Sequence, residues 1–227
     1  MIVVVLGMHR SGTSAMSGLL HKNGIVMGRE EKKEFYPPPI KENPKGFWEN
    51  VRFRRINDRI LKMHGYRVKS FSPAIPMIYP LNGSEADNKV LEIMRGLIIE
   101  YNSEFKNWGW KDPRTSLTLY PWMEVIKELN LLNDLRIIWM RRNADDIAHS
   151  MRKRGNQEKY KDHFVELSMK YYGKSHYYLY YVGYYNRLKI LQVDFRDDLL
   201  GRTGRTCKRL SEFLNYPIKD SSHIERR

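Results

Sequence analysis

The sequence predicts an α/β fold in which a doubly wound, mainly parallel sheet is flanked by helices. Short apolar runs rich in β-branched residues recur along the chain, and most of them are followed by a segment with helical periodicity. The first run, residues 2–6, is apolar at every position, which is typical of a strand buried on both faces of a parallel sheet. A chain of 227 residues with 41% hydrophobic content can form one such domain over residues 1–227.

The N-terminal part of the chain supplies the first strand and helix. The strand ends at Gly7, and apolar residues at helical spacing then predict a helix over residues 13–22, with Gly24 as its stop. Residues 28–48 are rich in charge and proline. We therefore expect an irregular insertion there that lies over a site as a lid or an acceptor-side segment.

The middle of the chain alternates between helical and irregular patterns. Helices are predicted over residues 50–63 and 85–105, separated by a loop at residues 71–84 that contains proline and glycine. A short strand at residues 108–110 and a helix over residues 117–129 follow.

The C-terminal part repeats the strand-then-helix order. Residues 135–140 predict a strand followed by a helix that continues through residue 154. Residues 157–186 are tyrosine-rich and helical in pattern, and aromatic residues at helical spacing favour packing over a base-stacking platform. Residues 189–193 predict a third strand, and residues 203–214 a last helix.

The charge balance restricts the class of partner. The chain has 40 lysines and arginines against 26 acidic residues, a formal charge of +14, which favours an anionic partner such as a nucleotide, a nucleic acid, an acidic polymer or a membrane surface. The single cysteine, Cys207, excludes an intramolecular disulfide, and no cysteine-rich zinc pattern is present. No run approaches the roughly 18 apolar residues of a membrane helix. We expect a cytoplasmic protein without a bound metal.

The segment that joins the first strand to the first helix carries the strongest motif. Residues 7–14 read GMHRSGTS, and we call them the glycine loop. A loop in this position turns its backbone N–H groups and the helix N-terminus toward a phosphate, so the fold is of the P-loop type. Thr13 stands where nucleotide triphosphatases have lysine, which disfavours ATP or GTP hydrolysis, while Arg10 supplies another cation.

The glycine loop resembles the 5′-phosphosulfate loop of sulfotransferases that use 3′-phosphoadenosine 5′-phosphosulfate (PAPS). Residues 142–150, RNADDIAHS, are similar to the 3′-phosphate segment of that family, in which an arginine and a serine eight positions later bind one phosphate. Arg154, four residues after the serine, lies on the same helical face and could add a contact. The donor-binding residues implied in this way are His9, Arg10, Ser11, Gly12, Thr13, Ser14, Arg142, Ser150 and Arg154.

The resemblance also implies residues that act on the reacting groups. Residues 110–114, WKDPR, are similar to the Lys-Asp-Pro segment of tyrosylprotein sulfotransferases, whose lysine assists the transfer. Lys111 is therefore a candidate catalytic residue beside Arg10, and both would stabilise charge on the leaving oxygen. A structural ion pair between Lys111 and Asp112 is the alternative interpretation.

A general base is implied by a third segment. Residues 43–50, NPKGFWEN, resemble a Gly-aromatic-aromatic-Glu segment of bacterial sulfotransferase-like proteins, which makes Glu49 the candidate. Glu49 could instead be an acidic residue in the first turn of the next helix. His9 and His64 are rival bases, because an imidazole can accept a proton near neutral pH.

The resemblance spans about residues 3–214 and implies a sulfotransferase that moves a sulfuryl group from PAPS to a hydroxyl or amine, with 3′-phosphoadenosine 5′-phosphate (PAP) as product. Residues 193–199 look like the late strand and acidic loop of the family. The chain lacks the first-loop lysine and the C-terminal glycine-rich nucleotide clamp of the cytosolic small-molecule sulfotransferases. Its contacts to adenine, and whether it is catalytically active, stay open.

Two other classes of function remain as alternatives. The first is a P-loop kinase or NTPase in which Asp194 binds magnesium. The second is a non-catalytic binder of nucleic acid or another polyanion, for which Arg52, Arg54, Arg55 and Arg59 form the densest basic cluster. The acceptor could be a small molecule, carbohydrate, lipid or peptide; the basic charge favours an anionic one, and nucleic acid is disfavoured. The oligomeric state is not predicted.

Overall fold

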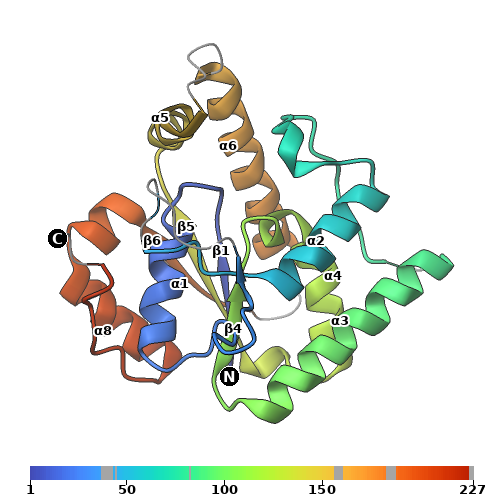
Figure 1. Cartoon of the computed structure of the whole chain (residues 1–227), viewed down its shortest axis with the longest axis horizontal. Coiled ribbons are helices and arrows are strands. Elements are labelled where there is room, and N and C mark those ends of the chain that lie inside the picture. The colour runs from blue at the N-terminus through green and yellow to red at the C-terminus, as the bar shows by residue number, and fades with distance from the viewer. Residues whose placement is uncertain (37–42, 44, 82, 156–160, 183–187, 225–227) are drawn as a thin grey trace.

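The computed structural model describes residues 1–36, 43, 45–81, 83–155, 161–182 and 188–224. Helices and strands alternate along most of this chain (Figure 1). The elements are β1 (Ile2–Leu6), α1 (Thr13–Lys22), β2 (Phe35–Tyr36), β3 (Glu49–Asn50), α2 (Val51–Met63), η1 (Val68–Ser70), α3 (Glu85–Glu104), β4 (Trp108–Lys111), α4 (Thr115–Glu128), η2 (Leu132–Asp134), β5 (Leu135–Arg141), α5 (Ala144–Gly155), α6 (Lys161–Tyr177), η4 (Tyr178–Val182), β6 (Lys189–Asp194), η5 (Phe195–Leu200) and α8 (Thr203–Leu214).

The main sheet has the strand order β4-β1-β5-β6, and all three of its pairings are parallel. Each parallel neighbour is reached by a crossover that contains at least one helix, as parallel pairing requires. The predicted α/β fold with a parallel sheet flanked by helices is thereby confirmed. Because the strands are parallel, their carboxyl ends meet at one edge of the sheet.

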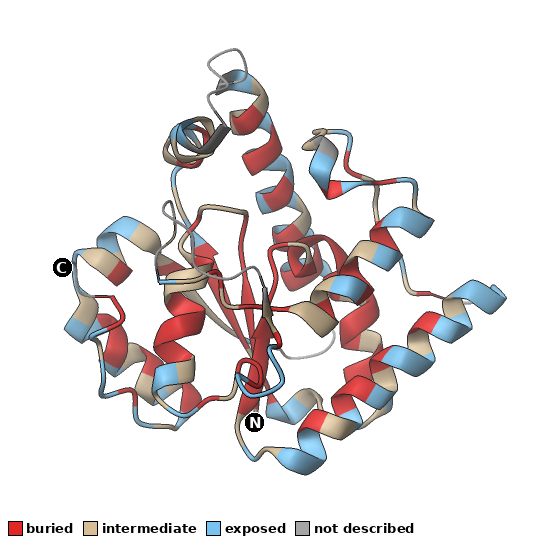
Figure 2. Ribbon diagram, in the orientation of Figure 1, coloured by how far each residue is buried: buried red, intermediate tan, exposed pale blue. Residues whose placement is uncertain are grey.

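The side chains of β1 divide the core into two parts. Ile2, Val4 and Leu6 belong to the larger cluster, with residues of α2, α3, α4 and α6, whereas Val3 and Val5 pack with residues of α1 and α8. This alternation follows from the two-residue period of a strand. In Figure 2 the strands of the sheet are coloured as buried, and the helices around them have both buried and exposed residues.

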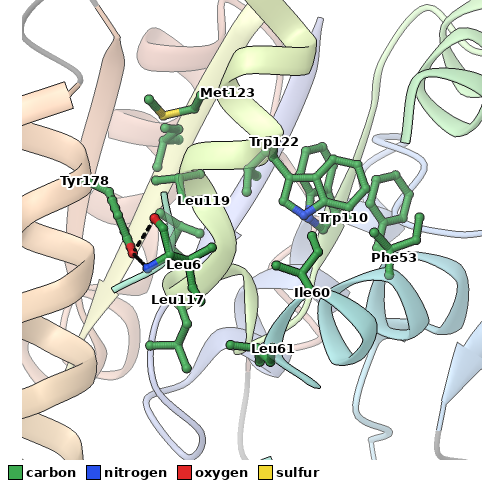
Figure 3. Close-up of a cluster of buried hydrophobic side chains, with 14 of the residues drawn as sticks. Leu6, Phe53, Ile60, Leu61, Trp110, Leu117, Leu119, Trp122, Met123 and Tyr178 are labelled. Carbon is green, nitrogen blue, oxygen red and sulfur yellow. Dashed lines mark hydrogen bonds between the residues drawn. The ribbon is translucent and has the colours of Figure 1, made fainter. Parts of the chain in front are cut away.

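An aromatic cluster in the larger core fixes α2 against β4. The rings of Phe53 and Trp110 stack with centroids 4.4 Å apart, and the ring centroid of Trp122 lies 5.1 Å from that of Phe53 (Figure 3). The indole N–H of Trp122 donates to Asn57 Oδ1 at 2.7 Å, so this buried polar group is satisfied. The packing orders two neighbouring segments, one carrying Glu49 just before α2 and one carrying Lys111 at the end of β4.

Within residues 28–48, where an irregular insertion is expected, the described residues include one short strand, β2. Strand β2 pairs antiparallel with β3, and the Arg29 guanidinium is buried between three carboxylates, those of Glu34, Glu100 and Glu104, at 2.6–2.7 Å. One charge of this segment, that of Arg29, is thus bound to Glu100 and Glu104 of α3. Residues 37–42 and 44 lie outside the described part of the chain.

The C-terminal half differs from the expectation in local detail. The helix expected over residues 157–186 is observed as α6 followed by a π-helical turn, η4, while residues 156–160 and 183–187 lie outside the described residues. A second π-helical segment, η5, follows β6 and was not predicted. Among the described helices, none combines the length and the apolar character needed to cross a membrane.

Candidate functional site

A cavity of about 710 Å³ lies at the carboxyl edge of the main sheet. The glycine loop after β1, Lys111 at the end of β4, Arg142 after β5 and Phe195 after β6 all contribute to its lining. Residues from the β3–α2 region, from η1 and from α6 also line it. Doubly wound sheets place their ligands at this edge, so the cavity is the candidate functional site.

The glycine loop is tight, and three of its positions have a backbone conformation that favours glycine, namely Gly7, Gly12 and Arg10, whose φ is 68°. Gly7 has φ 147° and Gly12 has φ 93°; a Cβ on Gly12 would lie 2.1 Å from Cδ2 of Phe195. The Ser11 hydroxyl donates to the Met8 carbonyl at 2.7 Å, and its side chain is buried beneath the loop. Thus Gly12, Thr13 and Ser14 line the cavity, whereas Ser11 holds the turn.

Three residues that the sequence analysis assigned to donor binding are joined in the structure. Arg10 Nε donates to Ser150 Oγ at 2.8 Å, and a terminal N–H of Arg142 donates to the Arg10 carbonyl at 2.8 Å. These contacts link the glycine loop to Arg142, which precedes α5, and to Ser150, which lies within α5. Arg154 also belongs to α5, but its side chain lies outside the described part of the structure.

Arg142 is partly withdrawn from water. Its guanidinium carbon lies 4.8 Å from the centre of the Phe195 ring, and burial lowers the pKa of Arg142, with Asp146 acting in the opposite direction. A desolvated cation gains from an anion beside it. The sequence analysis missed Phe195, which touches both Gly12 and Arg142; its position directly after the last strand was the available signal.

Lys111 links the glycine loop to Glu49. Its side chain is 1% exposed, and its ammonium donates to Ser14 Oγ at 3.0 Å, to the Phe47 carbonyl at 2.8 Å and to Glu49 Oε1 at 3.1 Å. Burial lowers the pKa of Lys111, although the Glu49 carboxylate raises it. The three acceptors match the three protons of an ammonium group. The structural alternative for Lys111 named Asp112 as the ion-pair partner, whereas the observed partner is Glu49.

Glu49 lies in strand β3, one residue before Asn50, which caps α2. It is therefore not a residue of the first helical turn, as the alternative interpretation supposed. Its second oxygen is 3.8 Å from Arg114, whose guanidinium is held at 2.7 Å by both Asp58 and Asp112. These carboxylates, together with Glu49, raise the pKa of Arg114 despite its burial. The sequence analysis did not assign Arg114 a role, although it ends the WKDPR segment.

The two histidines that are alternatives to Glu49 as the base differ in position, because one lines the cavity and the other does not. His9 lines the cavity, where its ring centroid lies 6.0 Å from that of Phe71 and 6.1 Å from that of Tyr171. His64 caps the end of α2, with Nδ1 3.0 Å from the Ile60 carbonyl, and is not part of the cavity lining.

The structure also shows the positions of the residues on which the two alternative functions depend. Asp194 caps η5 by accepting backbone N–H bonds from Arg196 at 2.8 Å and Asp197 at 3.0 Å. Within the described ranges, no three His, Cys, Asp or Glu side chains are grouped as metal ligands. The basic cluster on α2 is divided: Arg52 pairs with Glu100 at 2.6 Å, and Arg54 lines the cavity.

The parallel sheet and the basic cavity at its carboxyl edge define an α/β protein with a ligand-sized site where its strand ends meet. The family model described as "Sulfotransferase family" matches residues 3–220, so the chain belongs to the sulfotransferase family. A search of curated proteins found no match. Membership confirms the predicted family and supports sulfuryl transfer as the general activity.

Proposed function

We propose that the protein transfers a sulfuryl group from PAPS to a hydroxyl or amine of an acceptor. The observation that carries the proposal is the position of Lys111, which contacts Ser14 of the glycine loop and Glu49 in one cavity. This cation joins the loop expected to hold the donor to the residue expected to accept a proton.

The residues around the glycine loop fit the two phosphate groups of the donor. The N–H groups in the first turn of a helix have no partner within the helix, so Thr13 and Ser14 at the start of α1 can donate to the 5′-phosphosulfate. Arg142 and Ser150 would bind the 3′-phosphate. The buried Nε of Arg142 has no hydrogen-bond acceptor among the described residues, which agrees with a site for an anionic group.

Bond changes in the proposed reaction assign a task to each charged residue. The acceptor atom forms a bond to sulfur while the bond from sulfur to the bridging phosphate oxygen breaks in line with it. Glu49 takes the proton that the acceptor loses. Arg10 and Lys111 stabilise the negative charge that develops on the departing oxygen.

Calorimetric titration with PAP tests the donor site without any knowledge of the acceptor. We expect PAP to bind and ATP with magnesium to bind poorly. Arg142→Ala should weaken PAP binding by about 1.5–3 kcal/mol, the range for a hydrogen bond to a charged group. Arg141→Ala is the matched control, because Arg141 lies over the Tyr172 ring at 4.9 Å and outside the cavity lining. A preference for ATP with magnesium would support the kinase alternative.

Two further predictions belong with this proposal. We propose that residues 1–227 act as one domain, of which the family model covers residues 3–220. The cytoplasmic location stays a prediction. Fractionation of cells that express the chain with a C-terminal epitope would test it, and recovery of the protein with membranes would contradict it.

A further inference from the structure

A set of buried polar side chains contacts strand β3 without lining the cavity. Its members are Arg29, Glu34, Asn50 and Tyr101, each no more than 4% exposed, and none of them is among the described residues that line the cavity. Buried polar groups destabilise a fold unless they satisfy one another. The set adjoins the candidate base, because Asn50 follows Glu49 directly in the chain.

The hydrogen bonds of this set form a continuous chain. Asn50 Nδ2 donates to the Tyr101 hydroxyl at 2.8 Å, and that hydroxyl donates to Glu34 Oε2. Glu34 also accepts from Arg29, at 2.8 Å from the backbone N–H and at 2.7 Å from the guanidinium. The hydroxyl is thus an acceptor for one partner and a donor for the other. Its loss would leave Asn50 Nδ2 with the more distant Met27 carbonyl, at 3.4 Å, as acceptor.

Helix α3 holds the junction between β3 and α2 at two points. Tyr101 binds Asn50, which caps α2. Glu100 binds the guanidinium of Arg52, in the first turn of α2, at 2.6 and 2.7 Å. Arg29 joins the two points, because it contacts Glu100 at 2.7 Å and its guanidinium carbon lies 4.8 Å from the centre of the Tyr101 ring. The position of β3 therefore depends on α3 as well as on the sheet.

The two residues of β3 contact different elements. Glu49 binds Lys111 at the end of β4, whereas Asn50 binds Tyr101 of α3. Successive residues of a strand point to opposite sides, so one short backbone segment couples the two contacts. A shift of Asn50 relative to α3 would move the Glu49 carboxylate relative to the ammonium group. A displacement of about 1 Å at a reacting group can lower a rate by about 10².

We propose that Tyr101 is a positioning residue for Glu49 and that it acts through its hydrogen bond to Asn50. The proposal rests on the proposed function, because it takes Glu49 to be the base in sulfuryl transfer. Tyr101 holds β3 where Glu49 Oε1 lies 3.1 Å from the Lys111 ammonium. Glu34 accepts the proton of the Tyr101 hydroxyl and so leaves the oxygen free to accept from Asn50.

Two substitutions remove this hydrogen bond from opposite sides. Tyr101→Phe keeps the ring and loses the hydroxyl, whereas Asn50→Ser keeps a good N-cap for α2 but is too short to reach Tyr101. Each should lower the rate at which PAPS is converted to PAP by about tenfold, while PAP affinity stays within about twofold of the wild-type value. Because both remove the same bond, the double variant should lose no more than the larger single loss.

The titration of Lys111 is a second readout, and it needs no acceptor. Burial lowers the pKa of Lys111, whereas Glu49 raises it. Asp112 also raises this pKa and Arg114 lowers it, and both are retained in the variants. In protein with carbon-13-labelled lysine, the Cε signal that Lys111→Arg removes would be followed by NMR. The pKa should fall in both variants, as in Glu49→Gln but to a smaller extent, because the carboxylate has moved away.

Tyr178→Phe is the matched control. Tyr178 is as buried as Tyr101, but its hydroxyl bonds to the backbone of Ile78. Its loss should lower the melting temperature as Tyr101→Phe does and should leave the transfer rate and the Lys111 titration unchanged. The control thus separates positioning of Glu49 from a general loss of stability.

A fall in both readouts for Tyr101→Phe and Asn50→Ser, with no further loss in the double variant, supports the positioning role. An unchanged Lys111 pKa, an unchanged rate, additive losses or equal effects of Tyr178→Phe overturn it. Asn50→Ser alone decides if Tyr101→Phe does not fold. If the wild type binds no PAP or converts no PAPS, the proposed function fails, and the Lys111 titration still decides whether Tyr101 positions Glu49.

Discussion

Lys111 is a buried ammonium that the surrounding side chains and backbone keep in place. Transfer of a charge from water to a protein interior is unfavourable unless partners replace the lost hydration. Here the partners come from the glycine loop, from the Phe47 carbonyl and from Glu49. Loss of any one of them leaves a proton of the ammonium without an acceptor, so the group depends on the register of three separate segments.

Arg10→Ala should lower the rate at which PAPS is converted to PAP by a factor of about 10², as for the removal of one preorganised charged donor. The backbone carbonyl of Arg10, which accepts from Arg142, remains in the variant. The rate would be measured with a panel of hydroxyl and amine acceptors. A variant with weaker PAP binding but an unchanged rate would show that Arg10 binds the donor without assisting transfer.

Glu49→Gln should lower the transfer rate by about 10²–10⁴, the contribution of a general base, while PAP still binds. An amide keeps the shape of the side chain and an oxygen for Lys111, but it does not accept a proton. The two measurements are PAP release with the same acceptors and PAP affinity by calorimetry. A rate close to that of the wild type would assign the base to His9, which His9→Gln would then test.

At the scale of elements, a cluster of rings fastens β3 to α1 and to the segment after α8. Trp48 has φ 53°, its carbonyl accepts from Ser17 of α1 at 3.2 Å, and its ring centroid lies 5.4 Å from that of His223. The ring centroid of His21 in α1 lies 5.2 Å from that of Trp48. Trp48 stands between Phe47 and Glu49, so this cluster determines how both of them meet Lys111.

The buried His223 predicts a pH dependence of stability. Burial first, and then the charges of Lys45 and Lys22, lower the pKa of His223 to about 4, with Asp220 opposing them. An unfolded histidine has a pKa near 6.5, so between these values the unfolded chain binds more protons. The free energy of unfolding should therefore fall as the pH decreases from about 6.5 to 4.

Thermal unfolding of the wild type and of His223→Phe across this pH range is the corresponding measurement. The variant keeps a ring beside Trp48, and its melting temperature should vary less with pH. Some variation should persist because burial also lowers the pKa of His21, although Glu30 opposes it. Identical slopes in the two proteins would contradict the assignment to His223.

The elements differ in how far the sequence could predict them. Strands β1 and β5, helix α1 and the glycine loop have patterns that lie within a few consecutive residues, and their positions agree with the prediction. Strands β2 and β3 have two residues each and depend on pairing across 12 intervening residues. No local periodicity identifies such a pair, because its stability comes from tertiary contacts.

The site, like the fold, could be predicted where its residues stand in local motifs and not where they depend on distant partners. Arg10, Lys111 and Arg142 stand in motifs beside strand ends, and the structure brings all of them to one cavity. The roles of Arg114 and Phe195 depend on partners distant in sequence, such as Asp58 and Gly12. Pairings of that kind follow from the packing of α2 and η5 onto the sheet, which composition and spacing do not contain.

At the scale of the whole molecule, the cavity is assembled from segments that lie far apart in the sequence. The glycine loop belongs to the N-terminal unit of the sheet, whereas Arg142 and Ser150 come from residues more than 130 positions later. Arg142 also lies near Asp146 and Phe195, so three parts of the chain meet at its guanidinium. A ligand bound at this point contacts all three and should stabilise the fold as a whole.

PAP should therefore raise the melting temperature. Ligand at 100 times its dissociation constant stabilises the folded state by about 2.7 kcal/mol, which corresponds to a rise of about 5–10 °C for a chain of this size. In Arg142→Ala the same concentration should produce a smaller rise, whereas Arg141→Ala should behave as the wild type does. Because the contacts are ionic, the rise should shrink as salt increases from low to physiological concentration. A shift that is independent of both Arg142 and salt would place PAP somewhere other than this cavity.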